Sequence, residues 1–463
     1  TMASGALAVF ANGQDGRSSS YRIDRRALVS RHHPVLHSFD TLSPLSVGNG
    51  EFAFTCDVTG LQTFPTEYAN AMPLCTMSQW GWHTSPEPAS LEFKPTDYDS
   101  YGRKVPYQTD RAGQQELYDY LRENPHRLHL GRIAFDLRRS DGTPAKPSDI
   151  SKIEQKLDLW RGIIESRFEF DSVPVLVRTA VHPTRDVLVV SVESALVVDK
   201  RLKVRFAFPY GSPSMQAADW RAPDKHATGI ESIRDIGRSA GSATLVRQLD
   251  NDRYRVDIDC TGCRGLIPAG RHEFILEPAR RSFEFSVTFR PEGAARVRTR
   301  SQTVFASSEQ FWNGFWKRGA AIDLYGTVDP RAHELERRIV LSQYLTAINC
   351  SGSMPPQETG LTTNSWYGKF HLEMHWWHAA QFALWNRLPM LEKSLDWYNR
   401  ILPSAREKAR IQGYAGARWP KMTSPDGRDS PSPIGPLLIW QQPHPIFYAE
   451  LVFLNRPSRS TLL

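Results

Sequence analysis

The chain has 463 residues, 40% of them hydrophobic and 23% charged, and a formal net charge of +7. This length is too great for one ordinary core and predicts two or three domains. Lysine and arginine are interspersed with acidic residues, which argues against a nucleic-acid-binding protein, and no apolar run is long enough to span a bilayer.

The N-terminal segment "MASGALAVFANGQDG" carries a short apolar run ending in small residues, at the spacing that a signal peptidase prefers. We expect the remnant of an export signal, and therefore a secreted or periplasmic protein. Residues 1–38 are assigned to this tail and a first strand.

Short strands dominate residues 39–305. The segments "IIESRFEF", "VLVRTAV", "DVLVVSV", "LKVRFAF", "YRVDID" and "FEFSVTF" are rich in Val and Phe, with Gly, Pro, Asp and Ser between them. Such strands without intervening helices predict an antiparallel β-sandwich domain. A polar loop over 96–130 interrupts them, with a short helix at "GQQELYDYLREN".

The apolar period becomes helical after residue 305. Ser307 or Ser308 is suited to cap a helix in a linker over 306–328, and Asp329 is suited to cap the next one, with Pro330 at its first position. Further helices are expected over 370–387, 389–410 and 434–454. Residues 329–463 are thus predicted to form an all-helical domain, which also holds nine of the 13 tryptophans together with the linker.

Five cysteines leave at least one unpaired. Cys260 and Cys263 form a CTGC pair that suits a local disulfide, a redox pair or half of a metal site. A zinc site needs a second pair at similar spacing, and the other cysteines stand alone. We therefore expect an incidental turn with two thiols, and neither a metal nor another cofactor.

The segment "NSWYGKFHLEMHWWHAAQFALW" (364–385) surrounds one carboxylate, Glu373, with tryptophan and histidine. On a helix, Glu373 and Trp377 share one stripe, which we expect to face neighbouring helices. Three interpretations compete. The first is a metal site, because His371 and His375 have the i, i+4 spacing of metal ligands. The second is a hydrophobic core, which aromatic residues at helical spacing commonly build. The third is a sugar cleft, formed by tryptophans together with polar groups. Only the sugar cleft uses every residue type present.

Two later segments support the sugar cleft. "GYAGARWPKMTSPDGRDS" is a glycine-rich loop that carries Trp419, and "GPLLIWQQPHPIFYAEL" places Gln441 beside Trp440. Loops on a rigid scaffold commonly carry function. The same segments could instead simply connect helices.

The segments "SVGNGEFAF", "GLTTNSWYGKFHLEMHWW", "GARWPKM" and "IWQQPHPIFYAEL" occur in this order, and together they resemble family 65 of the glycoside hydrolases and its six-hairpin relatives. The resemblance implies an N-terminal β-supersandwich, a helical linker and an (α/α)6 catalytic barrel. It also implies inversion at the anomeric carbon, by hydrolysis or phosphorolysis of an oligosaccharide.

Residue by residue, the resemblance sets "GLTTNSWYGKFHLE" against the family pattern GLTGEGYRGHxFWDTE. Lys369 then replaces its His, Leu372 its Trp and Glu373 the Asp that binds sugar hydroxyls. The loop "GARWPKM" aligns with the family pattern GAxYPWE, so that Arg418, Trp419 and Lys421 stand at its x, Tyr and Trp. We expect Trp366, Trp376, Trp377 and Trp419 to stack on sugar rings, and Lys369, His371, Arg418, Lys421 and Gln441 to make polar contacts with the substrate. Their basic members would suit an acidic sugar such as a uronate.

The family's general acid is a glutamate in a GPDEY-like stretch, and the sequence has no such stretch after Trp419. We expect either a C-terminally incomplete barrel, whose exposed edge would favour a homodimer, or the use of Glu373 as the acid. A carboxyl group among tryptophans would have a raised pKa, which suits that role.

The sequence therefore predicts an inverting glycoside hydrolase or phosphorylase, with Glu373 as its candidate catalytic residue. Two other functions stay open. One is a non-catalytic carbohydrate-binding relative, and the other is a metal-dependent hydrolase that uses His371 and His375.

Overall fold

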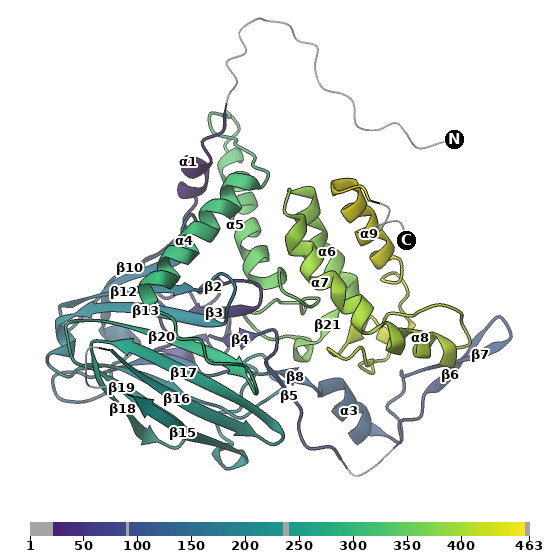
Figure 1. The fold of residues 1–463 in the computed structure, drawn as a ribbon, viewed down its shortest axis with the longest axis horizontal. Helices are drawn as coiled ribbons and strands as arrows, with labels where there is room; N and C mark the ends of the chain where they lie inside the picture. Colours follow the sequence, from purple (N-terminus) through teal and green to yellow (C-terminus); the bar gives the residue numbers. More distant parts are fainter. Residues whose placement is uncertain (1–21, 89–91, 235–239, 459–463) are drawn as a thin grey trace, which may run out of the picture.

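The computed structural model describes residues 22–88, 92–234 and 240–458. The predicted export signal lies outside these residues. Strands occupy the N-terminal part and helices the C-terminal part, on opposite sides of the molecule (Figure 1). In the described part of the chain, no helix combines the length and the apolar character that crossing a bilayer requires.

Antiparallel pairing joins nine strands into the largest sheet, in the order β1-β10-β11-β12-β13-β20-β17-β16-β15. Their bounds are β1 Val35–Leu36, β10 Ile150–Asp158, β11 Ile163–Phe170, β12 Val173–Val181, β13 Val187–Ser194, β15 His226–Arg234, β16 Ala240–Leu249, β17 Asp252–Thr261 and β20 Ser282–Pro291. Buried side chains alternate with outward ones along β11, as expected where one face of a strand is covered.

Smaller sheets complete the β part. One has four strands: β18 Cys263–Gly270, β19 Glu273–Pro278, β14 Leu202–Ala207 and β9 Arg132–Leu137. Another has three: β2 Leu45–Gly48, β3 Phe52–Cys56 and β4 Thr76–Ser78. The rings of Phe206 on β14 and Phe285 on β20 meet edge to face at 6.2 Å, so the four-stranded sheet packs on the large one. The strands predicted between 163 and 289 are confirmed.

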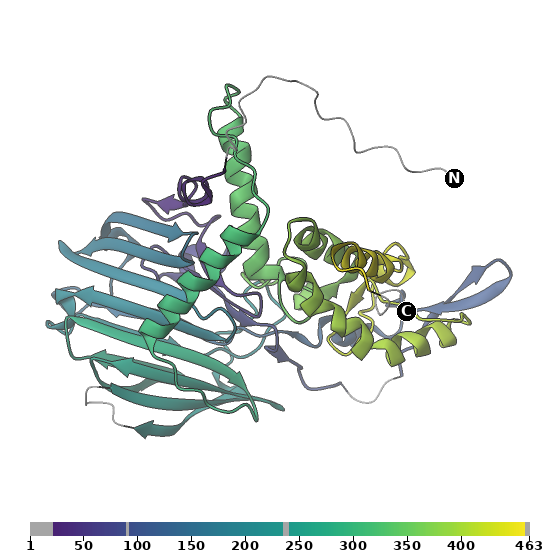
Figure 2. The same cartoon turned by 45° about the horizontal axis from the view of Figure 1, so that its top comes forward.

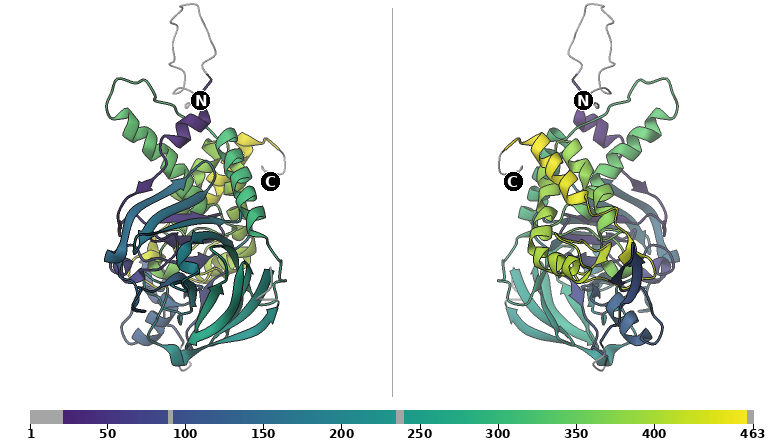
Figure 3. Two further views of the ribbon diagram at one scale, coloured as in Figure 1. Left: turned by 90° about the vertical axis from the view of Figure 1, so that its left-hand side faces the viewer. Right: turned by 90° about the vertical axis from the view of Figure 1, so that its right-hand side faces the viewer.

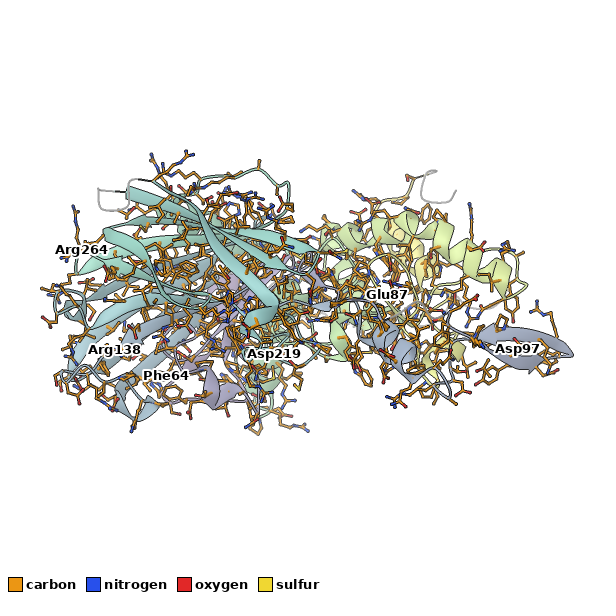
Figure 4. The ribbon with its side chains drawn as sticks, turned by 90° about the horizontal axis from the view of Figure 1, so that it is seen from below. Phe64, Glu87, Asp97, Arg138, Asp219 and Arg264 are labelled. Carbon is orange, nitrogen blue, oxygen red and sulfur yellow. The ribbon has the colours of Figure 1, made fainter. Side chains whose placement is uncertain are left out.

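The segment between β4 and β9 adds short elements: β5 Trp82–His83, β8 His126–Arg127, the hairpin of β6 Thr96–Ser100 and β7 Arg103–Tyr107, and α3 Gln115–Glu123. The prediction of a loop over 96–130 missed the hairpin but found the helix. Asp97 marks this hairpin in Figure 4, where it projects from the end of the molecule that holds the helices.

Two short helices, α1 Arg25–Ser30 and α2 Pro65–Tyr68, belong to the β part. After residue 300 the described chain forms α4 Ser301–Arg318, α5 Ala332–Cys350, α6 Leu372–Leu384, α7 Leu388–Arg400, α8 Leu402–Ile411 and α9 His444–Asn455. Helices α6, α7 and α9 contact one another, and the views of Figure 3 show them beside the sheets.

Several predicted helix ends are wrong. Helix α4 begins six residues before Ser307, whose hydroxyl donates to the carbonyl of Thr303 inside the helix. Helix α5 begins at Ala332, after Asp329 accepts from the backbone N–H of Arg331. The helix predicted over 389–410 is two helices, since Pro403 opens α8, and prolines delay the last helix until His444.

Helix α4 crosses the strands of the large sheet (Figure 2). The indole of Trp316 donates to the carbonyl of Leu159 over 2.7 Å, and the hydroxyl of Ser308 donates to that of Arg161 over 3.0 Å. The turn before β11 passes directly under the helix at Gly162, where φ is +66° and an added Cβ would overlap the indole of Trp312. Glycine is therefore required there by backbone geometry and by packing.

We predict that Gly162→Ala lowers the free energy of unfolding by about 3 kcal/mol, the combined cost of a left-handed alanine and an overfilled contact. The matched control is Gly142→Ala, at φ +84° with no atom near the added Cβ, which should cost only about 1–2 kcal/mol. Urea denaturation measures both. Equal losses would show that α4 does not press on this turn.

Candidate functional site

A two-residue strand pair assembles the site. Strand β21 (Phe370–His371) pairs with β22 (Met422–Thr423), and the backbone N–H of Leu372 donates to the carbonyl of Lys421 over 2.8 Å. Helix α6 begins at Leu372, directly after β21. This arrangement sets Lys421, from the loop after α8, against the first turn of α6, where Glu373 lies.

Glu373 is the centre of a charged cluster. Its Oε1 lies 2.7 Å from Nζ of Lys421 and 3.5 Å from Nδ1 of His371. The ammonium of Lys421 is also 3.0 Å from the same imidazole nitrogen, which in turn lies 3.7 Å from Oε2 of Glu358. We call Glu358, His371, Glu373, His378 and Lys421 the Glu373 cluster.

Four buried polar atoms of the Glu373 cluster have no hydrogen-bond partner in the part of the chain that the structure describes: Glu358 Oε2, His371 Nε2, Glu373 Oε2 and His378 Nδ1. Buried polar groups are nearly always paired, by protein or by solvent. Four unpaired atoms in one cluster therefore indicate a place where an external polar molecule completes the bonding.

The predicted raised pKa of Glu373 is wrong. Burial does raise the pKa, but hydrogen bonds from His371 and Lys421 outweigh it, and the net shift is downward. The position in the first turn of α6 also favours negative charge, because backbone N–H groups point toward it. Glu373 is consequently ionised at neutral pH and acts as an acceptor rather than as a proton donor.

Trp366 is the predicted tryptophan that lies at the cluster. Its ring centroid is 6.0 Å from that of His371, and the residue is 50% exposed. Trp376 instead packs on Phe447 of α9. Trp377 is 66% exposed and meets Trp376 edge to face. The predicted stripe of Glu373 and Trp377 therefore does not face neighbouring helices along its whole length.

Lys369 lies away from the cluster. Its buried ammonium donates to the carbonyls of Leu121 and Asn124 over 2.7 and 2.9 Å, and so ties the segment before α6 to the C-terminal end of α3. The structure thus gives Lys369 a structural position instead of the substrate contact that the resemblance implies.

His375 is buried, with its ring nitrogens 3.0 Å from the hydroxyl of Tyr398 and 2.9 Å from that of Ser394. Both nitrogens are therefore occupied. Across the residues that the structure describes, no three His, Cys, Asp or Glu side chains are grouped as metal ligands. The described thiols of Cys260 and Cys263 are buried and free, as the interpretation of an incidental turn expects.

The loop after α8 is held by its own polar groups. The side chains of Gln441 and Gln442 donate to the carbonyl of Trp419, and Gln442 also accepts from its N–H. Arg418 donates to the carbonyl of Pro436 over 2.8 Å. Gln441, Trp419 and Arg418 thus shape the loop that presents Lys421.

Sequence reasoning did not include Glu358 or His378 among the site residues. Glu358 lies in the irregular segment between α5 and α6, which carries no periodic pattern. His378 lies four residues beyond the first turn of α6, and burial lowers its pKa to about 4, so its imidazole is neutral at neutral pH. The available signal for His378 was its i, i+7 spacing from His371, which places two residues on one face of a helix.

We predict that Lys421→Met lowers the free energy of unfolding by about 2 kcal/mol at pH 7, because it leaves the carboxylate of Glu373 buried without its cation. The double variant with Glu373→Gln should lose less than the sum of the single variants. The matched control is Lys104→Met in the exposed pair with Asp99, which should cost less than about 1 kcal/mol.

The pH dependence of the free energy of unfolding follows from the lowered pKa of Glu373. Stabilisation by the Glu373 carboxylate is present above its ordinary value of 4.5 and is lost as pH falls through the lower folded-state pKa. Urea unfolding between pH 7 and pH 3.5 should show a smaller loss in Lys421→Met, because without this cation Glu373 keeps less of its downward pKa shift. Superimposable profiles of the two proteins would contradict the pairing.

Lys369 gives a second pH-dependence prediction, in which stability also rises with pH but in a higher pH range. Burial lowers its pKa from 10.5 to about 7, so above pH 7 the unfolded chain binds the proton that the folded chain releases. The free energy of unfolding should therefore rise more steeply between pH 7.5 and 9.5 in the wild type than in Lys369→Met. Lys393→Met, on the exposed side of α7, should keep the wild-type slope. Equal slopes in all three proteins would contradict the burial of a titrating ammonium.

No protein family model matches the sequence, and no curated protein is similar to it. The chain is similar in structure to a human-microbiome protein to which kojibiose phosphorylase activity is attributed, with a TM-score of 0.59 and 10% identity, over 86% of this chain and 52% of the other. For a bacterial glucoamylase complexed with acarbose the TM-score is 0.48 with 10% identity, over 90% and 57%.

The chain thus spans about half the length of the solved structures that it matches. At this level of identity the likeness concerns the fold. The fold resembles that of the solved protein described as a kojibiose phosphorylase, in line with the resemblance that the sequence motifs suggested.

Proposed function

We propose that the protein is a carbohydrate-active enzyme of the glycoside hydrolase type that acts on an oligosaccharide. The observation that carries this proposal is the Glu373 cluster: an ionised carboxylate with one unpaired buried oxygen, beside the half-exposed ring of Trp366. A sugar carries hydroxyl donors and an apolar ring face. The carboxylate of Glu373 suits the hydroxyls, and the ring of Trp366 suits the apolar face.

In this proposal Glu373 accepts hydrogen bonds from sugar hydroxyls. Its lowered pKa supports the role, because an ionised carboxylate is the stronger acceptor and remains charged near neutral pH. His371 and Lys421 hold the carboxylate in position. The unpaired Nε2 of His371 is available for a further hydroxyl.

Glu358 is proposed as the second carboxylate. An inverting glycosidase needs one carboxyl group to protonate the glycosidic oxygen, while water activated by another carboxylate, or phosphate, attacks the anomeric carbon from the opposite face. Glu358 is one-third exposed and shares the imidazole of His371 with Glu373. It is therefore proposed to give a proton to the glycosidic oxygen, while phosphate, or water activated by the ionised Glu373, attacks the anomeric carbon.

The finer parts of the proposal follow the family resemblance: a β-supersandwich, a linker, part of an (α/α)6 barrel, inversion and a location outside the cytoplasm. Lys421 neutralises Glu373, so it leaves little excess positive charge to select an acidic sugar. We therefore propose a neutral oligosaccharide.

The test is turnover of kojibiose and related glucose disaccharides, with and without inorganic phosphate, followed as released glucose or glucose 1-phosphate. Glu373→Gln and Glu358→Gln should each lower kcat/KM at least 100-fold, the range typical of removing a group that acts in the transition state. Glu334→Gln, in an exposed ion pair on α5, is the matched control and should keep wild-type activity.

The outcomes separate enzyme from binding protein. Sugar binding without turnover in the wild type, lost in Glu373→Gln, would identify a non-catalytic carbohydrate-binding relative. Wild-type turnover in both cluster variants would contradict the proposed site, and the absence of both binding and turnover would contradict the carbohydrate function.

A further inference from the structure

A concave surface is lined in part by the loop between α8 and α9, which also carries Lys421. It has a volume of about 370 Å³ and lies between the β6–β7 hairpin and helix α8. The hairpin side is formed by Pro95, Pro106, Tyr107 and Gln108 with the nearby Phe93, the helix side by Ser404, Glu407, Lys408, Ile411 and Gln412, and the base by Gly427, Arg428, Asp429 and Pro436. We call it the hairpin groove.

The walls of the hairpin groove are fixed to each other. The side-chain amide of Gln412 donates to the carbonyl of Pro106 over 3.0 Å, and the guanidinium of Arg103 donates to the carbonyl of Gly413. On the base, Lys408 pairs with Asp429. These bonds join hairpin, helix and loop, so the groove is built into the fold.

Two unpaired acceptors line the hairpin groove. Among the described residues, the side-chain oxygens of Gln108 and Gln412 are buried without a hydrogen-bond partner, and Gln412 as a whole is 7% exposed. A buried amide oxygen without a donor costs about 1–3 kcal/mol, which a ligand hydroxyl would recover. Two such oxygens beside the aromatic rings of Phe93 and Tyr107 call for a ligand that carries both donors and apolar surface.

We propose that the hairpin groove is a second carbohydrate-binding site, which takes a short neutral oligosaccharide. Saccharides supply hydroxyl donors for the two amide oxygens and C–H faces for the aromatic and proline surface. The volume lies within the range of about 300–1,000 Å³ that is usual for small-molecule sites. The choice of ligand class rests on the proposed carbohydrate function, whereas the site itself rests on the unpaired oxygens.

The loop between α8 and α9 connects the two sites. It contributes Lys421 to the Glu373 cluster, and Gly427, Arg428, Asp429 and Pro436 to the hairpin groove. Arg418, on the same loop, lies 5.2 Å from the ring centroid of Tyr107 and bonds to Pro436. A saccharide held in the groove would therefore contact the segment that positions Lys421.

Gln108→Leu is the sharpest variant, because it removes an unpaired buried acceptor. Stability should be kept or gained, since the folded state then no longer desolvates an oxygen without compensation. Binding in the groove should weaken at least tenfold. The matched control is Gln343→Leu on α5, which also removes a buried unpaired amide oxygen but lies outside the groove.

The experiment titrates the full chain with maltotriose and with cellotriose by isothermal titration calorimetry, in the wild type, Glu373→Gln, Gln108→Leu, Phe93→Ala and Gln343→Leu. For at least one sugar we expect a class of sites that persists in Glu373→Gln and in Gln343→Leu, and weakens at least tenfold in Gln108→Leu and in Phe93→Ala.

Loss of all binding in Glu373→Gln would overturn the groove while leaving the proposed function intact. Binding that survives Glu373→Gln but is unchanged in both Gln108→Leu and Phe93→Ala would also overturn it, as would binding of a proline-rich peptide without binding of either sugar. If the wild type shows only sites that persist in Glu373→Gln, with no class of sites that depends on Glu373, the result would count against the proposed function and leave the groove in place.

Discussion

The helical part of this protein depends on one constraint, which is to keep the ionised carboxylate of Glu373 buried. An unpaired buried charge is too costly to persist, so Glu373 requires a cation and hydrogen-bond donors from several parts of the chain. Lys421 comes from the loop after α8, and His371 from the residue that precedes α6. The two-residue pairing of β21 with β22 brings them together, and the site exists only when this pairing forms.

The rest of the architecture holds these segments in place. Lys369 fixes the approach to α6 against carbonyls at the C-terminal end of α3, and Gln441 and Gln442 fix the backbone of Trp419. Helix α4 lies across the large sheet through the indole of Trp316 and the close approach at Gly162. The polar residues that the sequence placed in a substrate site thus divide between direct members of the cluster and residues that shape its support.

The sequence predicted the β part well, because half-buried strands leave an alternating pattern that is read locally. Helix ends were predicted less well: a continuous apolar pattern over 389–410 hid the break that Pro403 introduces. At the site, the sequence placed Glu373 and His371 in one segment rich in tryptophan and histidine, and on neighbouring stripes of the expected helix. It gave no indication of Glu358, which reaches the cluster through a tertiary contact, nor of the lowered pKa, which depends on Lys421 from a distant segment.

The most direct test of the account is a crystal structure of the protein soaked with kojibiose or glucose. We expect a pyranose hydroxyl within hydrogen-bond distance of Glu373 Oε2, with the ring of Trp366 against the sugar and Lys421 still on Oε1. A structure in which Oε2 is bonded to a protein donor, or in which Glu373 has turned away from Lys421, would contradict it.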